Sequence, residues 1–98
     1  MEFEGTVKKD STSKLWIIEV SALDIMTQGT SKKDAVFMLK DAVRELMTAI
    51  FSEKATKDLC LDVHFHGLNT FGISASNSKL LIALAHHCSI RRIYSSSF

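Results

Sequence analysis

The segment 25–46, IMTQGTSKKDAVFMLKDAVREL, constrains the fold of this chain more than any other part of its sequence. It predicts a short strand, a tight turn at Gly29 and a long amphipathic helix that begins near Ser31. Ser31 is a suitable N-cap, and Asp34 three residues later gives a weak form of the capping box. Apolar residues then recur with the three-and-four spacing of one helix face: Ala35, Leu39, Ala42, Val43, Leu46 and Ile50. A helix with one apolar side needs another element to cover that side.

Segments that alternate between apolar and polar residues flank this helix and supply a sheet. In the segment 2–8, Phe3, Gly5 and Val7 alternate with polar residues, which is typical of a half-buried strand. The next segment is apolar on both faces around residues 15–18, so we expect it inside the sheet. Further strands are expected at 25–28, 61–66 and 71–75, and a second helix from Lys79 to about Ile90. The order βββαβ(β)α predicts an α+β domain, in which one long helix covers a mostly antiparallel sheet of three to five strands.

The length of 98 residues suits one domain, which we place at residues 1–90 with a short C-terminal tail at 91–98. Twelve basic and eleven acidic side chains give a net charge of +1. That balance argues against the broad basic surface of a non-specific nucleic-acid-binding protein. It does not exclude a local basic patch.

The cysteines and the N-terminus set the expected cellular location. Cys60 and Cys88 lack metal-ligand spacing and form no CxxC motif, so both are expected to be free thiols that behave as small apolar residues. The N-terminus, MEFEGTVKK, lacks the apolar core of a signal peptide. The longest apolar run, LLIALA at 80–85, is too short to span a bilayer. We therefore expect a cytoplasmic protein without membrane association.

The same apolar run predicts an assembly surface on the last helix. Its residues are apolar on every side of the helix, and such a helix is normally buried. A small domain has difficulty burying all sides of its last helix alone, so a partner chain is the simplest cover. We expect a homodimer or a larger homo-oligomer. The expected interface residues are Leu80, Leu81, Ile82 and Leu84.

Catalytic and metal-binding motifs are weak in this sequence. It has no GxSxG motif, and three strand-borne acids, Glu19, Asp24 and Asp62, are too few for a two-metal site. Asp62, His64 and His66 share one face of a strand, where two histidines two residues apart can bind Zn²⁺. A solvated polar strand face explains them more simply, because no second pair of ligands is evident. We expect neither an enzyme nor a bound cofactor or metal.

The run 16–46, WIIEVSALDIMTQGTSKKDAVFMLKDAVREL, resembles the HicB-like antitoxin family. The matching residues are Thr27, Gln28, Gly29 and Thr30 at the turn, and Asp34, Ala35 and Ala42 in the helix. The later run 70–85, TFGISASNSKLLIALA, is similar to the end of the domain in longer members, where a final strand and a Leu-rich helix lead into a helix-turn-helix. The resemblance spans roughly residues 2–85 and implies a partial RNase H-like fold without its active site.

What the resemblance implies for function is the binding of a small HicA-type ribonuclease toxin, whose RNA surface the domain blocks, usually as a dimer. Acids such as Glu2, Glu4, Asp10 and Glu19 would attract a basic toxin if they cluster. The sequence departs from the family where SALDIM at 21–26 replaces a connector that often contains proline. Only SIRRIYSSSF, at 89–98, stands where the family's DNA-binding module is expected, so operator DNA binding stays open.

Two other functions fit the sequence. One is a small metal-binding domain or metal-dependent enzyme that uses Asp62, His64 and His66. Retained Zn²⁺ that is lost in His64→Ala would support it. The other is a stand-alone structural or regulatory domain without a toxin partner, which a gene neighbourhood lacking a small toxin reading frame would favour.

Overall fold

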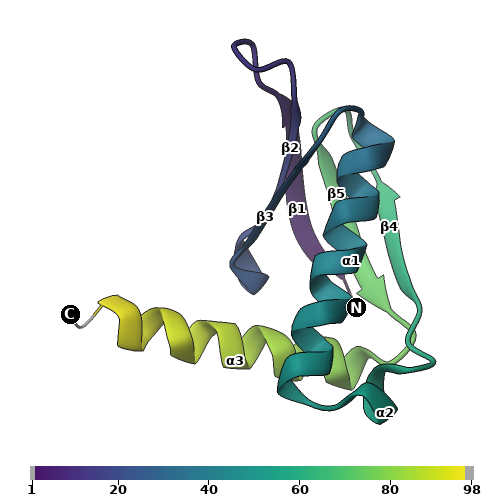
Figure 1. The fold of residues 1–98 in the computed structure, drawn as a ribbon, viewed down its shortest axis with the longest axis vertical. Coiled ribbons are helices and arrows are strands. Elements are labelled where there is room, and N and C mark those ends of the chain that lie inside the picture. The colour runs from purple at the N-terminus through teal and green to yellow at the C-terminus, as the bar shows by residue number, and fades with distance from the viewer. Residues whose placement is uncertain (1, 97–98) are drawn as a thin grey trace.

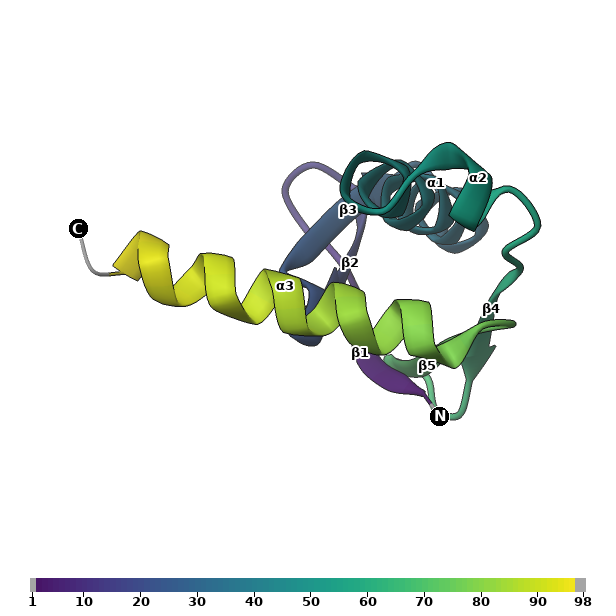
Figure 2. The same cartoon turned by 90° about the horizontal axis from the view of Figure 1, so that it is seen from below.

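A computed structural model describes the backbone of residues 2–96, with side chains for 2–54 and 56–88. Its elements are β1 (Phe3–Lys9), β2 (Trp16–Val20), the 3₁₀ helix η1 (Ser21–Leu23), β3 (Ile25–Gly29), α1 (Lys32–Ile50), α2 (Glu53–Thr56), β4 (Leu61–Phe65), β5 (Thr70–Ala75) and α3 (Ser78–Ser96). The five strands form one antiparallel sheet in the order β3-β2-β1-β5-β4. Helix α1 lies over one face of this sheet, and α3 crosses one end of the helix–sheet layer pair (Figures 1 and 2). The predicted α+β class is confirmed.

Helix α1 begins where the sequence predicts, because two reciprocal hydrogen bonds cap its N-terminus. The Ser31 hydroxyl accepts a hydrogen bond from the backbone N–H of Asp34 at 3.0 Å. In return, the Asp34 carboxylate accepts one from the backbone N–H of Thr30 at 2.9 Å. The stripe that α1 buries against the sheet repeats every four residues: Ala35, Leu39, Val43 and Met47.

Lys32 also connects the first turn of α1 to the turn between β4 and β5, at one edge of the sheet. Its ammonium donates to the backbone carbonyl of Leu68, in the turn between β4 and β5, at 3.0 Å. The same ammonium lies 4.8 Å from the ring centroid of Phe65 on β4 and 5.8 Å from that of Trp16 on β2. Cation–π contacts of this kind add modest attraction, so Lys32 holds the β4–β5 turn near the start of α1.

Helix α3 contributes to the core and then continues past it. Leu81, Leu84 and Cys88 are buried in the same apolar cluster as the sheet and α1. The predicted end near Ile90 is wrong, because the helix continues to Ser96 and leaves the sheet behind it (Figure 1). The sequence after Ile90 holds no glycine or proline to end a helix. The predicted tail 91–98 is therefore helical as far as Ser96, and residues 97–98 lie outside the described residues.

The burial of the expected interface residues has a cause within the chain itself. Leu81 and Leu84 are 1% and 0% exposed inside the chain's own core, so neither side chain is available to a partner. For these two residues the predicted interface is corrected, since α1 and the sheet cover them without a second chain. Leu80 is half-buried against the core, and Ile82 is 44% exposed.

Among the described residues, no helix is both long and apolar enough to cross a membrane.

Candidate binding surface

The face of the sheet opposite α1 is not covered by any helix of the described chain (Figure 2). We call it the open face. Because successive strand residues point to opposite faces, the register assigns its members directly. They are Glu2, Glu4, Thr6, Lys8, Ile17, Glu19, Met26, Gln28, Asp62, His64, Thr70, Gly72 and Ser74.

The open face is acidic although the chain as a whole carries a charge of +1. Its carboxylates are those of Glu2, Glu4, Glu19 and Asp62, against the single ammonium of Lys8. Within the described side chains, no ion pair neutralises these four carboxylates. Helix α1 mixes both signs, since it carries Lys32, Lys33, Lys40 and Arg44 together with Asp34, Asp41 and Glu45. The open face is therefore more acidic than the chain as a whole.

Gly72, on β5, leaves space for the carboxylate of Glu2 on the open face. Strand pairing places Gly72 between Glu4 of β1 and His64 of β4. The carboxylate of Glu2 lies against Gly72 so closely that an added Cβ would be 2.5 Å from its Cδ. A side chain at this position would displace the carboxylate, so the glycine allows Glu2 to lie flat on the sheet.

An apolar strip borders these acids on β2 and β3. Met26 is 66% exposed on the edge strand β3, and Ile17 is half-buried on β2. Two shallow hollows flank Met26. One, of about 300 Å³, is lined by Ile17, Met26, Thr27 and Gln28. The other, of about 200 Å³, is lined by Glu19, Val20, Ser21, Asp24, Ile25 and Met26. Protein–protein interfaces commonly combine an apolar centre, in which Met is enriched, with a polar rim.

The residues considered for metal binding lie on and beside this face but do not form a site. Asp62 and His64 project from β4, whereas His66 follows the strand and its Nδ1 lies 3.4 Å from the Thr70 hydroxyl. The rings of His64 and His66 are 6.5 Å apart between centroids. Within the described residues, no three His, Cys, Asp or Glu side chains are placed to hold a metal ion.

The acids expected to attract a partner are partly brought together. Glu2, Glu4 and Glu19 share the open face, whereas Asp10 lies in the turn after β1 and binds Ser13. Sequence reasoning missed Asp62 as a member of this acidic surface, and it missed Met26 as its most exposed apolar residue. The alternation of polar and apolar residues along β4 did indicate that the side chain of Asp62 faces solvent. The sequence did not show that this strand pairs with β5 in the same sheet.

Comparison with known proteins adds no relative. No protein-family model matches the chain, and no curated protein and no solved structure matches it. The function is therefore argued from the residues and the geometry described above.

Proposed function

We propose that this chain is a non-catalytic antitoxin module of the HicB type, which binds a small basic HicA-type ribonuclease through its open face. The observation that carries the proposal is the acidic excess of the open face, where Glu2, Glu4, Glu19 and Asp62 lie with only Lys8 against them in a chain whose net charge is +1. The resemblance of the runs 16–46 and 70–85 to the HicB-like family supports the same reading.

Charge complementarity explains how such a face can neutralise a ribonuclease. A protein that binds RNA presents basic side chains to the phosphates. An acidic surface attracts that basic region, speeds association and competes with RNA for the same groups. An inhibitor of this kind needs a firm scaffold rather than a reactive group, and a sheet backed by α1 and α3 supplies one.

The proposal also includes a location and an assembly. The module acts in the cytoplasm, which suits cysteines that form no disulfide with each other, Cys60 and Cys88. It forms a homodimer in which α3 takes part, through its exposed side rather than through Leu81 and Leu84.

The test uses, as the probe, the product of a small basic reading frame beside this chain's gene, and the absence of such a reading frame would count against the proposal. Glu4→Lys and Asp62→Lys together reverse two charges on the open face, at exposed positions far from α1. The matched control, Asp41→Lys with Glu45→Lys, makes the same change in net charge on the exposed side of α1.

We expect the open-face variant to weaken binding by about tenfold to a hundredfold and to lose inhibition of RNA cleavage. The control should bind and inhibit as the unmodified chain does. Isothermal titration calorimetry measures the affinity, and cleavage of a labelled RNA measures inhibition. Equal losses in both variants, or no binding by the unmodified chain, would contradict the proposal and favour a stand-alone regulatory domain.

A further inference from the structure

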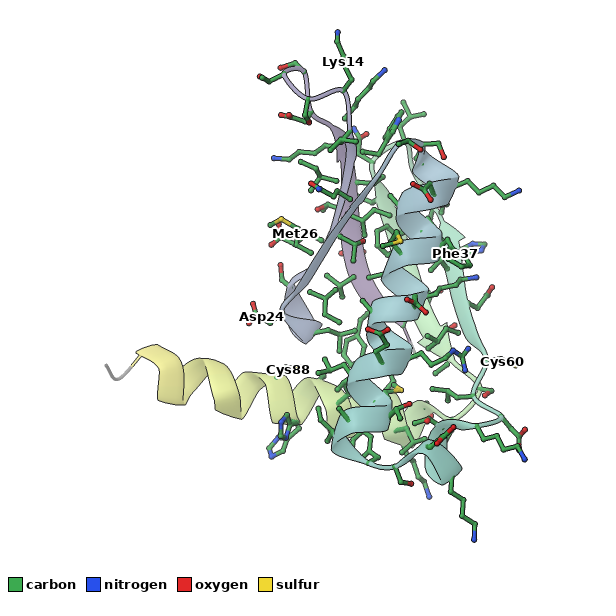
Figure 3. All side chains as sticks on the ribbon, in the orientation of Figure 1. Lys14, Asp24, Met26, Phe37, Cys60 and Cys88 are labelled. Carbon is green, nitrogen blue, oxygen red and sulfur yellow. The ribbon has the colours of Figure 1, made fainter. Side chains whose placement is uncertain are left out.

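Strand β4 is one of the two edges of the sheet, and no strand of the described chain lies beyond it. The two edges lie on opposite sides of the molecule, where Figure 3 labels Met26 on β3 and Cys60 just before β4. An edge strand presents a row of backbone N–H and C=O groups that another strand can bind. The β4 edge is therefore a candidate contact surface of a kind different from the open face.

The bonds between β4 and β5 decide which backbone groups of β4 point outward. Ser76 donates its backbone N–H to the Cys60 carbonyl at 2.9 Å, and His66 donates its own to the Thr70 carbonyl at 3.3 Å. Both pairs continue the β4–β5 register, so the even-numbered residues of β4 bond to β5. The odd-numbered residues direct their N–H and C=O groups out of the sheet: Leu61, Val63 and Phe65. Among the described residues, no backbone bond from a turn or loop reaches these groups.

Strand β4 lacks the features that usually prevent an edge strand from pairing. Lysine, proline and bulges are the common ones. The sequence of β4, LDVHF, contains neither residue type, and its register with β5 runs without a bulge from Leu61 to Phe65. On the side that faces α1, Val63 is only half-buried and Phe65 is 38% exposed. A further strand beside β4 would bond to the outward backbone groups and cover this apolar row.

The sequence of β4 is complementary to itself in an antiparallel pair. A two-fold axis at Val63 places Leu61 opposite Phe65 of the second copy, so that apolar side chains meet on the side of α1. On the open face, the same axis places Asp62 opposite His64 of the second copy, and the symmetry repeats this pair. Side chains directly opposite each other have their Cβ atoms about 4.5–5.5 Å apart. An imidazole N–H can donate a hydrogen bond to a carboxylate at that spacing, so the one acid of the strand meets a suitable partner.

The other edge strand, β3, does not have this complementarity. Its middle residue is Thr27, whose hydroxyl donates to the Ala35 carbonyl of α1 at 3.3 Å. An axis at Thr27 would place Met26 opposite Gln28, which pairs neither two apolar side chains nor two opposite charges. The comparison selects β4 as the edge that suits a second copy.

We infer that the β4 edge binds the β4 edge of a second copy of this chain, in antiparallel register about Val63. The two sheets then form one continuous sheet, with both open faces on the same side. The contact is isologous and occupies the edge of each copy, so it ends at two chains. It does not involve the ribonuclease and thus goes beyond the proposed function. Combined with a contact through α3, it would join dimers into larger assemblies.

The size of this contact sets the expected affinity. One strand of five residues from each copy gives an interface far smaller than that of a stable complex. We therefore expect a Kd on the order of 0.3 mM, so that the pair is scarce at micromolar concentration and predominates near 1 mM.

The test uses the full chain with Ile82→Glu, which removes the expected contact through α3. Sedimentation equilibrium measures its mass, and amide hydrogen exchange by NMR locates the contact, at about 20 µM and about 1 mM. At the higher concentration we expect the mass to approach that of two chains. The amides of Leu61, Val63 and Phe65 should exchange about threefold more slowly there. Those of Asp62 and His64 should change little, because they already bond to β5.

Exchanging the two polar residues of β4 tests the register in the same Ile82→Glu chain. Asp62→His alone places two imidazoles opposite each other, so it should raise the Kd about threefold to tenfold. Asp62→His together with His64→Asp restores the imidazole–carboxylate pair in the opposite order without changing the composition. This swapped chain should have a Kd within about twofold of the original. Asp41→His, on the exposed side of α1, is the matched control and should leave the Kd unchanged.

Several outcomes would overturn the inference. They are an unchanged mass between the two concentrations, slower exchange at Met26 and Gln28 of β3 instead of β4, and species larger than a dimer in the Ile82→Glu chain. A swapped chain that associates no better than Asp62→His would also overturn it, because the register about Val63 would be wrong. None of these measurements contains the ribonuclease, so the proposed function and this pairing can fail separately.

Discussion

The carboxylate of Asp10 organises the turn between β1 and β2. Its Oδ2 accepts hydrogen bonds from the Ser13 hydroxyl at 2.6 Å and from the Ser13 backbone N–H at 2.9 Å. These bonds, with a smaller contribution from the charge of Lys8, lower the pKa of Asp10 below its ordinary value of 3.8. The same turn requires a left-handed residue at Lys14, whose φ is 64°. A short polar segment without glycine or proline thus forms a defined turn through one side chain.

The lowered pKa of Asp10 predicts a pH dependence that Ser13 controls. Because the folded pKa lies below the unfolded one, the ionised carboxylate stabilises the fold fully above the unfolded pKa. This stabilisation is lost as the pH falls through the folded value, below 3.8. Ser13→Ala removes the hydroxyl donor, so we expect the pKa of Asp10 to rise toward 3.8 in an NMR titration of its carboxyl carbon. Ser11→Ala, in the same turn, should leave it unchanged, and an unaltered pKa in Ser13→Ala would contradict this account.

The pairing of β1 with β5 depends on glycines that serve opposite faces of the sheet. Gly5 faces the core, where an added Cβ would lie 2.7 Å from both Cε atoms of the fully buried Phe71 ring. Gly72 faces the solvent side, where an added Cβ would meet only the carboxylate end of the exposed Glu2 side chain. Neither glycine has a positive φ, so the close approach is what decides the effect of a substitution.

We therefore expect Gly5→Ala to destabilise the fold by about 1–3 kcal/mol, because the Phe71 ring has no free volume in which to move. Gly72→Ala should change the free energy of unfolding by less than about 0.5 kcal/mol, since Glu2 can swing into solvent. Urea unfolding followed by Trp16 fluorescence measures both. The interpretation fails if the two variants lose the same stability.

At the scale of elements, local periodicity was enough to predict every strand and the start of α1. The two-residue period of β1 and β4 and the Ser31 cap are properties of neighbouring residues, and the structure keeps them. The end of α3 was not predictable in the same way, because no stop signal after Ile90 distinguishes a helix that continues from one that frays. The burial of Leu81 and Leu84 was also misjudged, since it depends on where η1, β5 and α1 meet the helix.

At the scale of the whole molecule, the acidic open face depends on topology more than on sequence pattern. Alternation showed that Glu2 and Glu4 share one side of β1, but it did not show which side the helices would cover. In the strand order β3-β2-β1-β5-β4, β2 lies beside β1 and contributes Glu19, and the edge strand β4 contributes Asp62. A charge pattern assembled from three strands becomes visible only when the strand order is known.

Self-assembly stays a prediction, and an interface on α3 would have to use a side of the helix other than that of Leu81 and Leu84. Leu81, Leu84 and Cys88 belong to the core, whereas Ile82 is 44% exposed on a helix of 19 residues that continues beyond the sheet (Figure 1). Most of the stability of a helix in a protein comes from tertiary packing, so a second copy beside the part of α3 that continues beyond the sheet would stabilise it. Substitutions at Leu81 or Leu84 would instead damage the core.

We expect the purified chain to be a dimer at micromolar concentration. Ile82→Glu should make it a folded monomer with a lower unfolding temperature that no longer depends on protein concentration. Light scattering coupled to size-exclusion chromatography measures the mass, and circular dichroism measures unfolding. Phe37→Glu is the matched control, because Phe37 is 66% exposed on α1, and it should leave the dimer intact. Leu84→Ala should lower the stability by about 2–5 kcal/mol, which separates a core position from an interface position on the same helix. A monomeric unmodified chain, or dissociation by Phe37→Glu but not by Ile82→Glu, would exclude assembly through this side of α3.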